Sequence, residues 1–224
     1  MKHLKWKIHA ENKYIHLLVI LVLALLISPA IEGPREHHFP LLSLVFLLSI
    51  LFVLRALQLK RKFFLSCIGI GLAAFIFELV TSTCTTERCV QDYSIISLSI
   101  FAIFLAVTII AMIHKMFSAT KVTVDTILGG ISVYLLIGML WTIFYYLIYY
   151  FDRSAFTFSN RISETYLFYF SFTTLTTLGY GDAFPVNKFA MILTSFEAIV
   201  GQVYLAVFVA RLVGLHTIKH SQGT

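Results

Sequence analysis

The residues with the most specific chemistry form one short stretch in the C-terminal third of the chain. They read Thr177-Leu178-Gly179-Tyr180-Gly181-Asp182. Glycine adopts positive φ without a steric penalty, so a Gly-X-Gly alternation permits positive φ at every second residue. Alternating backbone handedness can point successive carbonyl oxygens towards one axis. Four copies of such a segment would form stacked rings of oxygens that replace the hydration shell of a cation.

The elements around this stretch must hold it in an apolar environment. Hydrophobic residues make up 59% of the 224 residues and charged residues 12%, whereas a soluble domain has about 45–50% and about 25%. We therefore predict that most of the chain lies in lipid. Non-helical backbone is tolerated there only where protein or a water-filled cavity satisfies its polar groups.

Six apolar segments are long enough to cross a bilayer, which takes about 17–25 residues. They are 14–31, 41–59, 63–80, 94–116, 127–151 and 189–215. A seventh, 164–178, is too short to span and predicts a re-entrant segment with a Thr-rich helix. The fold class is thus predicted as an all-α integral membrane protein. For 14–31, a cleaved signal peptide is the alternative, because basic residues precede it and Ser28-Pro29-Ala30 follows.

Most of the 17 basic residues lie in alternate loops, on the same side as both termini. Positive charge accumulates in cytoplasmic loops, so both termini are expected to be cytoplasmic. The expected location is a plasma membrane, such as a bacterial inner membrane. The net charge of +6 follows from these loops and does not indicate nucleic-acid binding.

The stretch 177–182 resembles the selectivity-filter signature of potassium channels, usually written Thr-Val-Gly-Tyr-Gly-Asp. The resemblance is detailed over 125–215 and is one of layout over the first four segments. It implies a pore domain at 121–224, with an outer helix, a pore helix, a filter and an inner helix, after a membrane module at 1–120. One filter segment cannot enclose an ion, so a homotetramer is expected, with K⁺ as the permeant ion and no other cofactor.

The resemblance assigns a role to each filter residue. It implies K⁺ binding by carbonyl oxygens of Thr177, Leu178, Gly179 and Tyr180, with the Thr177 hydroxyl at the inner end. Gly181 completes the outer turn.

The same resemblance implies contacts behind the filter. Asp182 would hydrogen-bond there and place negative charge at the outer mouth, and Tyr180 would pack into an aromatic cuff beside Tyr169 and Phe170. Leu178 stands where Val is commoner, which is expected to alter packing more than ion chemistry.

Two residues of the last segment have two interpretations each. Gly201 resembles the hinge glycine of potassium-channel inner helices, but a small residue also permits close helix packing. Glu197 is an acid inside the membrane and hence a functional candidate. It either lines the ion cavity or hydrogen-bonds to threonines of the pore helix.

The first four segments have the layout of voltage-gated channels without their gating charges. Residues 94–113 contain no Arg or Lys, so steep voltage dependence is not expected. A structural belt, a lipid contact and a docking module for an unknown gating partner all remain open. Asp125 is expected to cap the helix of 127–151, and contact with the inner gate of a neighbouring subunit is the alternative. The aromatic residues of 141–151 are expected to anchor this helix at the membrane interface.

Cys84 and Cys89 share a loop expected outside the membrane, where an oxidising environment permits a disulfide. Two free thiols, or a crude metal site without flanking His, are the alternatives. Cys67 is expected to be a small core residue.

The predicted function is passive conduction of K⁺. The alternatives are a non-selective cation channel of the same fold and a non-conducting scaffold or modulatory subunit. No arrangement of His, Cys and Asp has catalytic or metal-binding spacing, so an enzyme is not expected.

Overall fold

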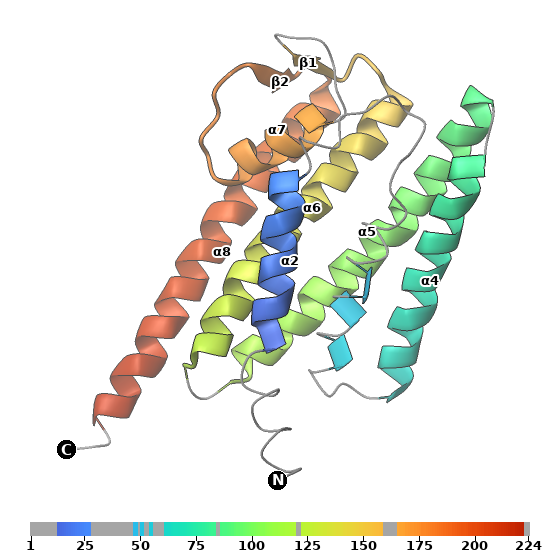
Figure 1. Ribbon diagram of the computed structural model, residues 1–224. Helices are drawn as coiled ribbons and strands as arrows, with labels where there is room; N and C mark the ends of the chain where they lie inside the picture. Colours follow the sequence, from blue (N-terminus) through green and yellow to red (C-terminus); the bar gives the residue numbers. More distant parts are fainter. Residues whose placement is uncertain are drawn as a thin grey trace. The chain divides into compact units, whose positions relative to one another are not determined.

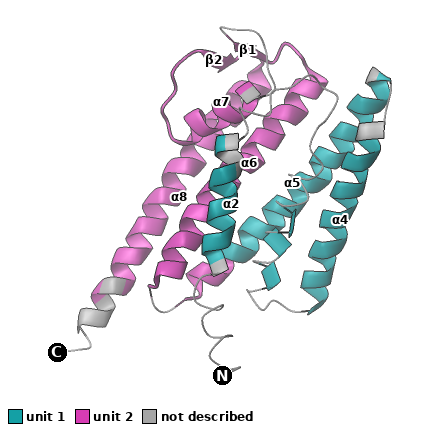
Figure 2. Cartoon of the chain, viewed as in Figure 1, with its two compact units in different colours: residues 1–112 teal, residues 113–224 magenta. Residues whose placement is uncertain are grey.

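The computed structural model describes residues 13–27, 47–48, 50–51, 54–55, 61–83, 86–119, 122–158 and 165–221. The chain divides into two compact units, 1–112 and 113–224 (Figure 2). The elements are α2 (Lys13–Ile27), α4 (Arg61–Thr83), α5 (Glu87–Phe117), α6 (Val124–Phe151), β1 (Phe156–Phe158), α7 (Thr165–Leu175), β2 (Ala183–Pro185) and α8 (Lys188–Ser221) (Figure 1).

Four helices in the described part of the chain are long and apolar enough to cross a membrane. They are α4, α5, α6 and α8, over Arg61–Thr81, Arg88–Phe117, Val124–Phe151 and Lys188–Leu215. The last four predicted spans are therefore confirmed as apolar helices, although α5 begins at Glu87, before the predicted residue 94. The first predicted span falls on α2, whose apolar part, Tyr14–Leu23, is shorter than these four helices. The second lies largely outside the described residues, so six spans stay a prediction.

The start of α6 differs from the prediction. Thr123 is the N-cap, and its side chain accepts a hydrogen bond of 3.2 Å from the Thr126 N–H. Asp125 lies in the first turn, where a negative charge interacts favourably with the helix dipole. The prediction that Asp125 caps this helix is therefore wrong.

In the second unit, the short helix α7 packs against both α6 and α8 (Figure 1). The chain that leads into α7 and the chain that leaves it form an antiparallel pair, with Thr157 opposite Phe184. The Val186 N–H extends this pairing to the Ala155 carbonyl at 2.8 Å. Backbone hydrogen bonds thereby join the two ends of the chain segment between α6 and α8.

Glycines allow the helices of each unit to approach closely. A Cβ at Gly138 of α6 would lie 2.7 Å from Phe172 Cζ of α7, and one at Gly130 would collide with the Phe208 ring of α8. In the first unit, Gly71 of α4 likewise faces Leu47. Small residues at such crossings favour packing of membrane helices.

The aromatic cluster at the end of α6 is partly internal. Trp141 and Tyr145 are 7% and 0% exposed. Tyr145 packs against Phe156 of β1 and Phe170 of α7, with ring centroids 5.4 and 5.1 Å away. For Trp141 and Tyr145, the prediction of an interface anchor is wrong, because neighbouring elements cover these rings.

Asp152, directly after α6, connects the end of this helix with the start of α8. Its Oδ1 accepts hydrogen bonds from the Ser154 hydroxyl at 2.6 Å and the Ser154 N–H at 3.0 Å, and its Oδ2 accepts one from Asn187 Nδ2 at 2.8 Å. Asn187 Oδ1 in turn accepts from the Phe189 N–H at 2.7 Å. These hydrogen bonds lower the pKa of the Asp152 carboxyl below its usual 3.8. The bond from the Ser154 hydroxyl has the largest effect, and those from Asn187 and the Ser154 N–H have smaller ones.

We predict that this connection weakens in acid. Because the folded pKa of Asp152 is lowered, its contribution to stability is fully present above the unfolded pKa and is lost as the pH falls through the folded pKa. Asp152→Ala should therefore lower the melting temperature at neutral pH, with a difference from wild type that shrinks as the pH falls below 3.8. Thermal unfolding in detergent across pH measures this. A difference that is constant with pH would contradict a role for the ionised carboxylate.

Candidate functional site

The site begins where α7 ends. The Thr177 N–H donates to the Thr174 carbonyl at 2.9 Å, and the Leu178 N–H donates to the Thr173 carbonyl at 2.8 Å. These two bonds, around a residue with positive φ, form a Schellman motif. The residue with positive φ is Thr177, at 59°. This position usually holds glycine, and a β-branched residue there stores about 1–3 kcal/mol of strain.

The predicted filter segment, 177–182, continues this backbone pattern. φ is positive at Thr177, Gly179 and Gly181, at 59°, 50° and 80°. A Cβ at Gly179 or Gly181 would meet no atom within 4 Å. Within one chain, these glycines are therefore required by φ and not by lack of space. The alternation of positive φ expected from Gly-X-Gly is therefore present, and it begins at Thr177, two residues before the first glycine.

The filter segment is exposed on the single chain but supported from two sides. The Gly179 N–H is 3.2 Å from the Thr173 carbonyl, which therefore receives two N–H groups of the segment. On α8, Gln202 Nε2 lies 3.4 Å from the Thr177 hydroxyl oxygen. Gln202 was not among the predicted site residues, because its position gives no signal until α8 is placed beside α7.

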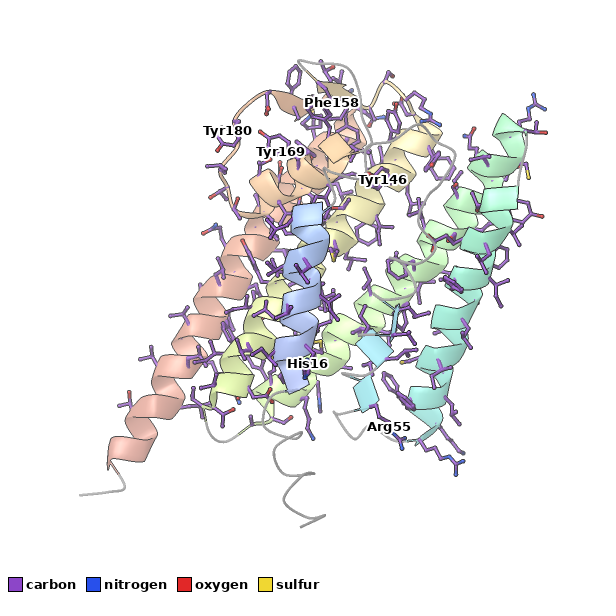
Figure 3. All side chains as sticks on the ribbon, in the orientation of Figure 1. His16, Arg55, Tyr146, Phe158, Tyr169 and Tyr180 are labelled. Carbon is purple, nitrogen blue, oxygen red and sulfur yellow. The ribbon has the colours of Figure 1, made fainter. Side chains whose placement is uncertain are left out.

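Tyr169 of α7 holds the C-terminal end of the segment. Its hydroxyl donates to the Asp182 carboxylate, at 2.9 Å from Oδ2 and 3.1 Å from Oδ1. Its ring stacks on the Tyr180 ring with an interplanar angle of 3° and centroids 6.2 Å apart (Figure 3). Phe170, expected in the same aromatic cuff, packs on Tyr145 and Phe156 instead.

Glu197 lies at the meeting point of three helices and is 0% exposed. Its Oε1 is 2.6 Å from the Ser171 hydroxyl of α7, and its Oε2 accepts a hydrogen bond from the Tyr145 hydroxyl of α6. The predicted partners on α7 were threonines, so the expected residue type is wrong. Neither Tyr145 nor Ser171 was a predicted site residue, since hydroxyl groups on separate helices carry no common signal in sequence.

Gly201 is buried against the end of α7. A Cβ at this position would collide with the Leu175 carbonyl oxygen and lie 3.0 Å from Leu175 Cδ1. The same carbonyl accepts a hydrogen bond of 3.2 Å from the Tyr134 hydroxyl of α6. Gly201 therefore has the packing role that was one of its two predicted roles. Bending of the helix at this glycine stays a prediction.

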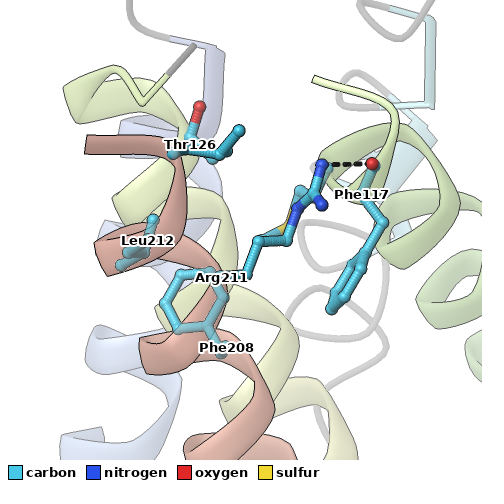
Figure 4. A pocket seen from close by; sticks show the side chains of 7 residues that line it. Phe117, Thr126, Phe208, Arg211 and Leu212 are labelled. Carbon is cyan, nitrogen blue, oxygen red and sulfur yellow. Dashed lines mark hydrogen bonds between the residues drawn. The ribbon is translucent and has the colours of Figure 1, made fainter. Parts of the chain in front are cut away.

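Arg211, in the C-terminal half of α8, connects this helix to the end of α5 and to the chain that follows it (Figure 4). Its Nη2 donates to the carbonyls of Phe117 and Ala119, the latter at 2.9 Å, and its guanidinium lies 4.9 Å from the Phe117 ring centroid. The small cavity beside it has a volume of about 10 Å³. A cavity of that volume holds about one water molecule.

The remaining site predictions concern cysteines and metals. Cys67 is buried and free, as expected of a core residue. Cys89 takes part in a disulfide, but Cys84 lies outside the described residues, so the pairing of the two stays a prediction. Over the part of the chain that the structure describes, no three His, Cys, Asp or Glu side chains are grouped to hold a metal ion.

The helices and the filter segment of the second unit coincide with a known type of domain. Residues 124–216 match the family model described as "Ion channel". The matched range begins with α6, includes α7 and the filter segment, and ends within α8. An ion channel domain supports passive ion conduction and, with four apolar helices, a membrane protein. No significant similarity to a curated protein or to a solved structure was found.

We predict that Gly201→Ala weakens the packing of α8 on α7 in the ion channel domain. The new Cβ meets backbone and cannot be accommodated by a side-chain movement, so the free energy of unfolding should fall by about 1–3 kcal/mol. Gly214→Ala is the matched control on the same helix, because a Cβ there meets nothing within 4 Å. The control should be neutral or stabilise by up to about 1 kcal/mol. Chemical unfolding in detergent compares the two, and equal effects would contradict the packing role.

Proposed function

We propose that the chain is one subunit of a homotetrameric channel that conducts K⁺ selectively and passively across a membrane. The observation that carries the proposal is the backbone of Thr177-Leu178-Gly179-Tyr180-Gly181, with positive φ at every second residue directly after a helix end. Four such segments around an axis would line a path with carbonyl oxygens, which replace the hydration shell of K⁺. The residues proposed to bind K⁺ are Thr177, Leu178, Gly179 and Tyr180.

The surface of α8 supports assembly of several chains. Ile192, Phe196, Ile199 and Val203 form a stripe at helical spacing, and each is 55–71% exposed on the single chain. A stripe of this kind is covered by lipid, by a pore or by a neighbouring subunit. Because one filter segment cannot enclose an ion, we assign part of this stripe to contacts between subunits in a closed tetramer.

The proposed topology has six spans, with both termini cytoplasmic, in a plasma membrane. The basic residues on the cytoplasmic side of this arrangement support it. α5 has no Lys or Arg between Arg88 and Lys115, which supports a channel without steep voltage dependence.

We predict that purified protein in planar bilayers, with KCl on one side and NaCl on the other, gives a current that reverses near the potassium equilibrium potential. Gly179→Ala should abolish this selectivity or the current. On the single chain the added Cβ has space, so the variant acts through φ, which costs an L-residue about 1–2 kcal/mol at positive values.

The outcomes separate the rival functions. A wild-type current that reverses near zero would replace the proposal with a non-selective cation channel, for which Leu178 in place of Val is the motivating difference. Absence of current from tetramers of verified mass, with every stimulus tried, would favour a scaffold or modulatory subunit.

A further inference from the structure

A buried carboxyl group joins three helices of the second unit. Glu197 belongs to α8, Ser171 to α7 and Tyr145 to α6, and all three are 0% exposed. Ser171 Oγ lies 2.6 Å from Glu197 Oε1 and also 2.8 Å from the Gly138 carbonyl oxygen of α6. Tyr145 donates to Glu197 Oε2. Since the burial is complete within one chain, a neighbouring subunit is not needed to cover this group.

No Lys, Arg or His among the described residues forms a salt bridge with Glu197. The titratable groups that face it are the tyrosines Tyr134 and Tyr145 of α6, while its partner on α7, Ser171, does not titrate. An ionised carboxylate inside a membrane protein is costly unless a cation or several donors compensate it.

The hydrogen-bond geometry identifies the protonation state that satisfies every contact. The Ser171 hydroxyl has one proton but has acceptor oxygens at 2.6 and 2.8 Å. If Glu197 were ionised, one of these contacts would place two oxygens together without a proton between them. If Glu197 carries a proton on Oε1, it donates to Ser171, Ser171 donates to Gly138, and Tyr145 donates to Oε2.

We propose that Glu197 is a positioning residue for the filter segment, acting as a neutral carboxylic acid that fixes α7 between α6 and α8. The inference deepens the proposed function and uses its selectivity as one readout. Ser171 lies on the same short helix as Thr173 and Thr174, whose carbonyls hold the N–H groups of Thr177, Leu178 and Gly179. A displacement of α7 therefore moves the acceptors that define the start of the filter.

The test compares Glu197→Gln with Glu197→Ala in tetramers of verified mass. Glutamine keeps a donor for Ser171 and an acceptor for Tyr145, so it should keep the wild-type K⁺/Na⁺ permeability ratio. Alanine removes both bonds and leaves the buried Tyr145 hydroxyl without this partner, so it should lower this ratio. Rescue by glutamine separates a neutral hydrogen-bonding role from a role of negative charge.

A milder pair of variants applies where Glu197→Ala does not assemble. Ser171→Ala removes the central hydroxyl, and Ser132→Ala is its matched control. Ser132 is 0% exposed like Ser171, but it lies on α6. Its hydroxyl donates only to the Leu128 carbonyl of its own helix, at 2.8 Å. Ser171→Ala should lower the permeability ratio, and Ser132→Ala should leave it unchanged.

A second readout does not depend on conduction. The infrared spectrum at neutral pH should contain the carbonyl stretch of a protonated carboxylic acid that Glu197→Gln removes. Glutamine as damaging as alanine, or no such band, would overturn the neutral acid. A wild-type permeability ratio in both Glu197→Ala and Ser171→Ala would overturn the positioning role. A wild-type current reversing near zero overturns the proposed function instead, and the infrared band then decides the state of Glu197 by itself.

Discussion

The last carbonyl groups of a helix have no partner within that helix, and the structure around the end of α7 follows from this constraint. The Thr173 carbonyl receives the N–H groups of Leu178 and Gly179, so the end of the helix and the start of the filter segment satisfy each other. Thr177 adopts positive φ to make this possible. Gly179 and Gly181 continue the alternation of positive φ that Thr177 begins.

The same short helix needs support from its neighbours, because eleven residues bury too little surface to hold one orientation alone. Gly138 and Gly201 bring α6 and α8 into contact with α7, against Phe172 and the Leu175 carbonyl. The Glu197 carboxyl adds hydrogen bonds between these helices. At the C-terminal end of the filter segment, Tyr169 connects α7 to Asp182. Contacts at both ends and on both sides thus determine where the filter segment lies.

Much of this arrangement was predictable because it depends on local residue types. Uninterrupted apolar segments predict α4, α5, α6 and α8, and Gly-X-Gly predicts the alternation of φ at Gly179 and Gly181. Positive φ at Thr177 was not predictable, since a β-branched residue disfavours it and only the Schellman bonds of α7 impose it. Asp125 looked like a cap for α6, but the Thr123 hydroxyl reaches the helix N–H group instead.

The sequence alone determined the apolar helices, the short helix between the last two and the residues with freedom for positive φ, because these follow from composition and from contacts a few residues apart. Only the tertiary structure decided what surrounds the filter segment. It buried Trp141 and Tyr145 among neighbouring elements and brought Ser171 to Glu197, 26 residues further along the chain. It also placed Gly201 against backbone. Such contacts depend on how helices cross, and helix crossing leaves no local signal in the chain.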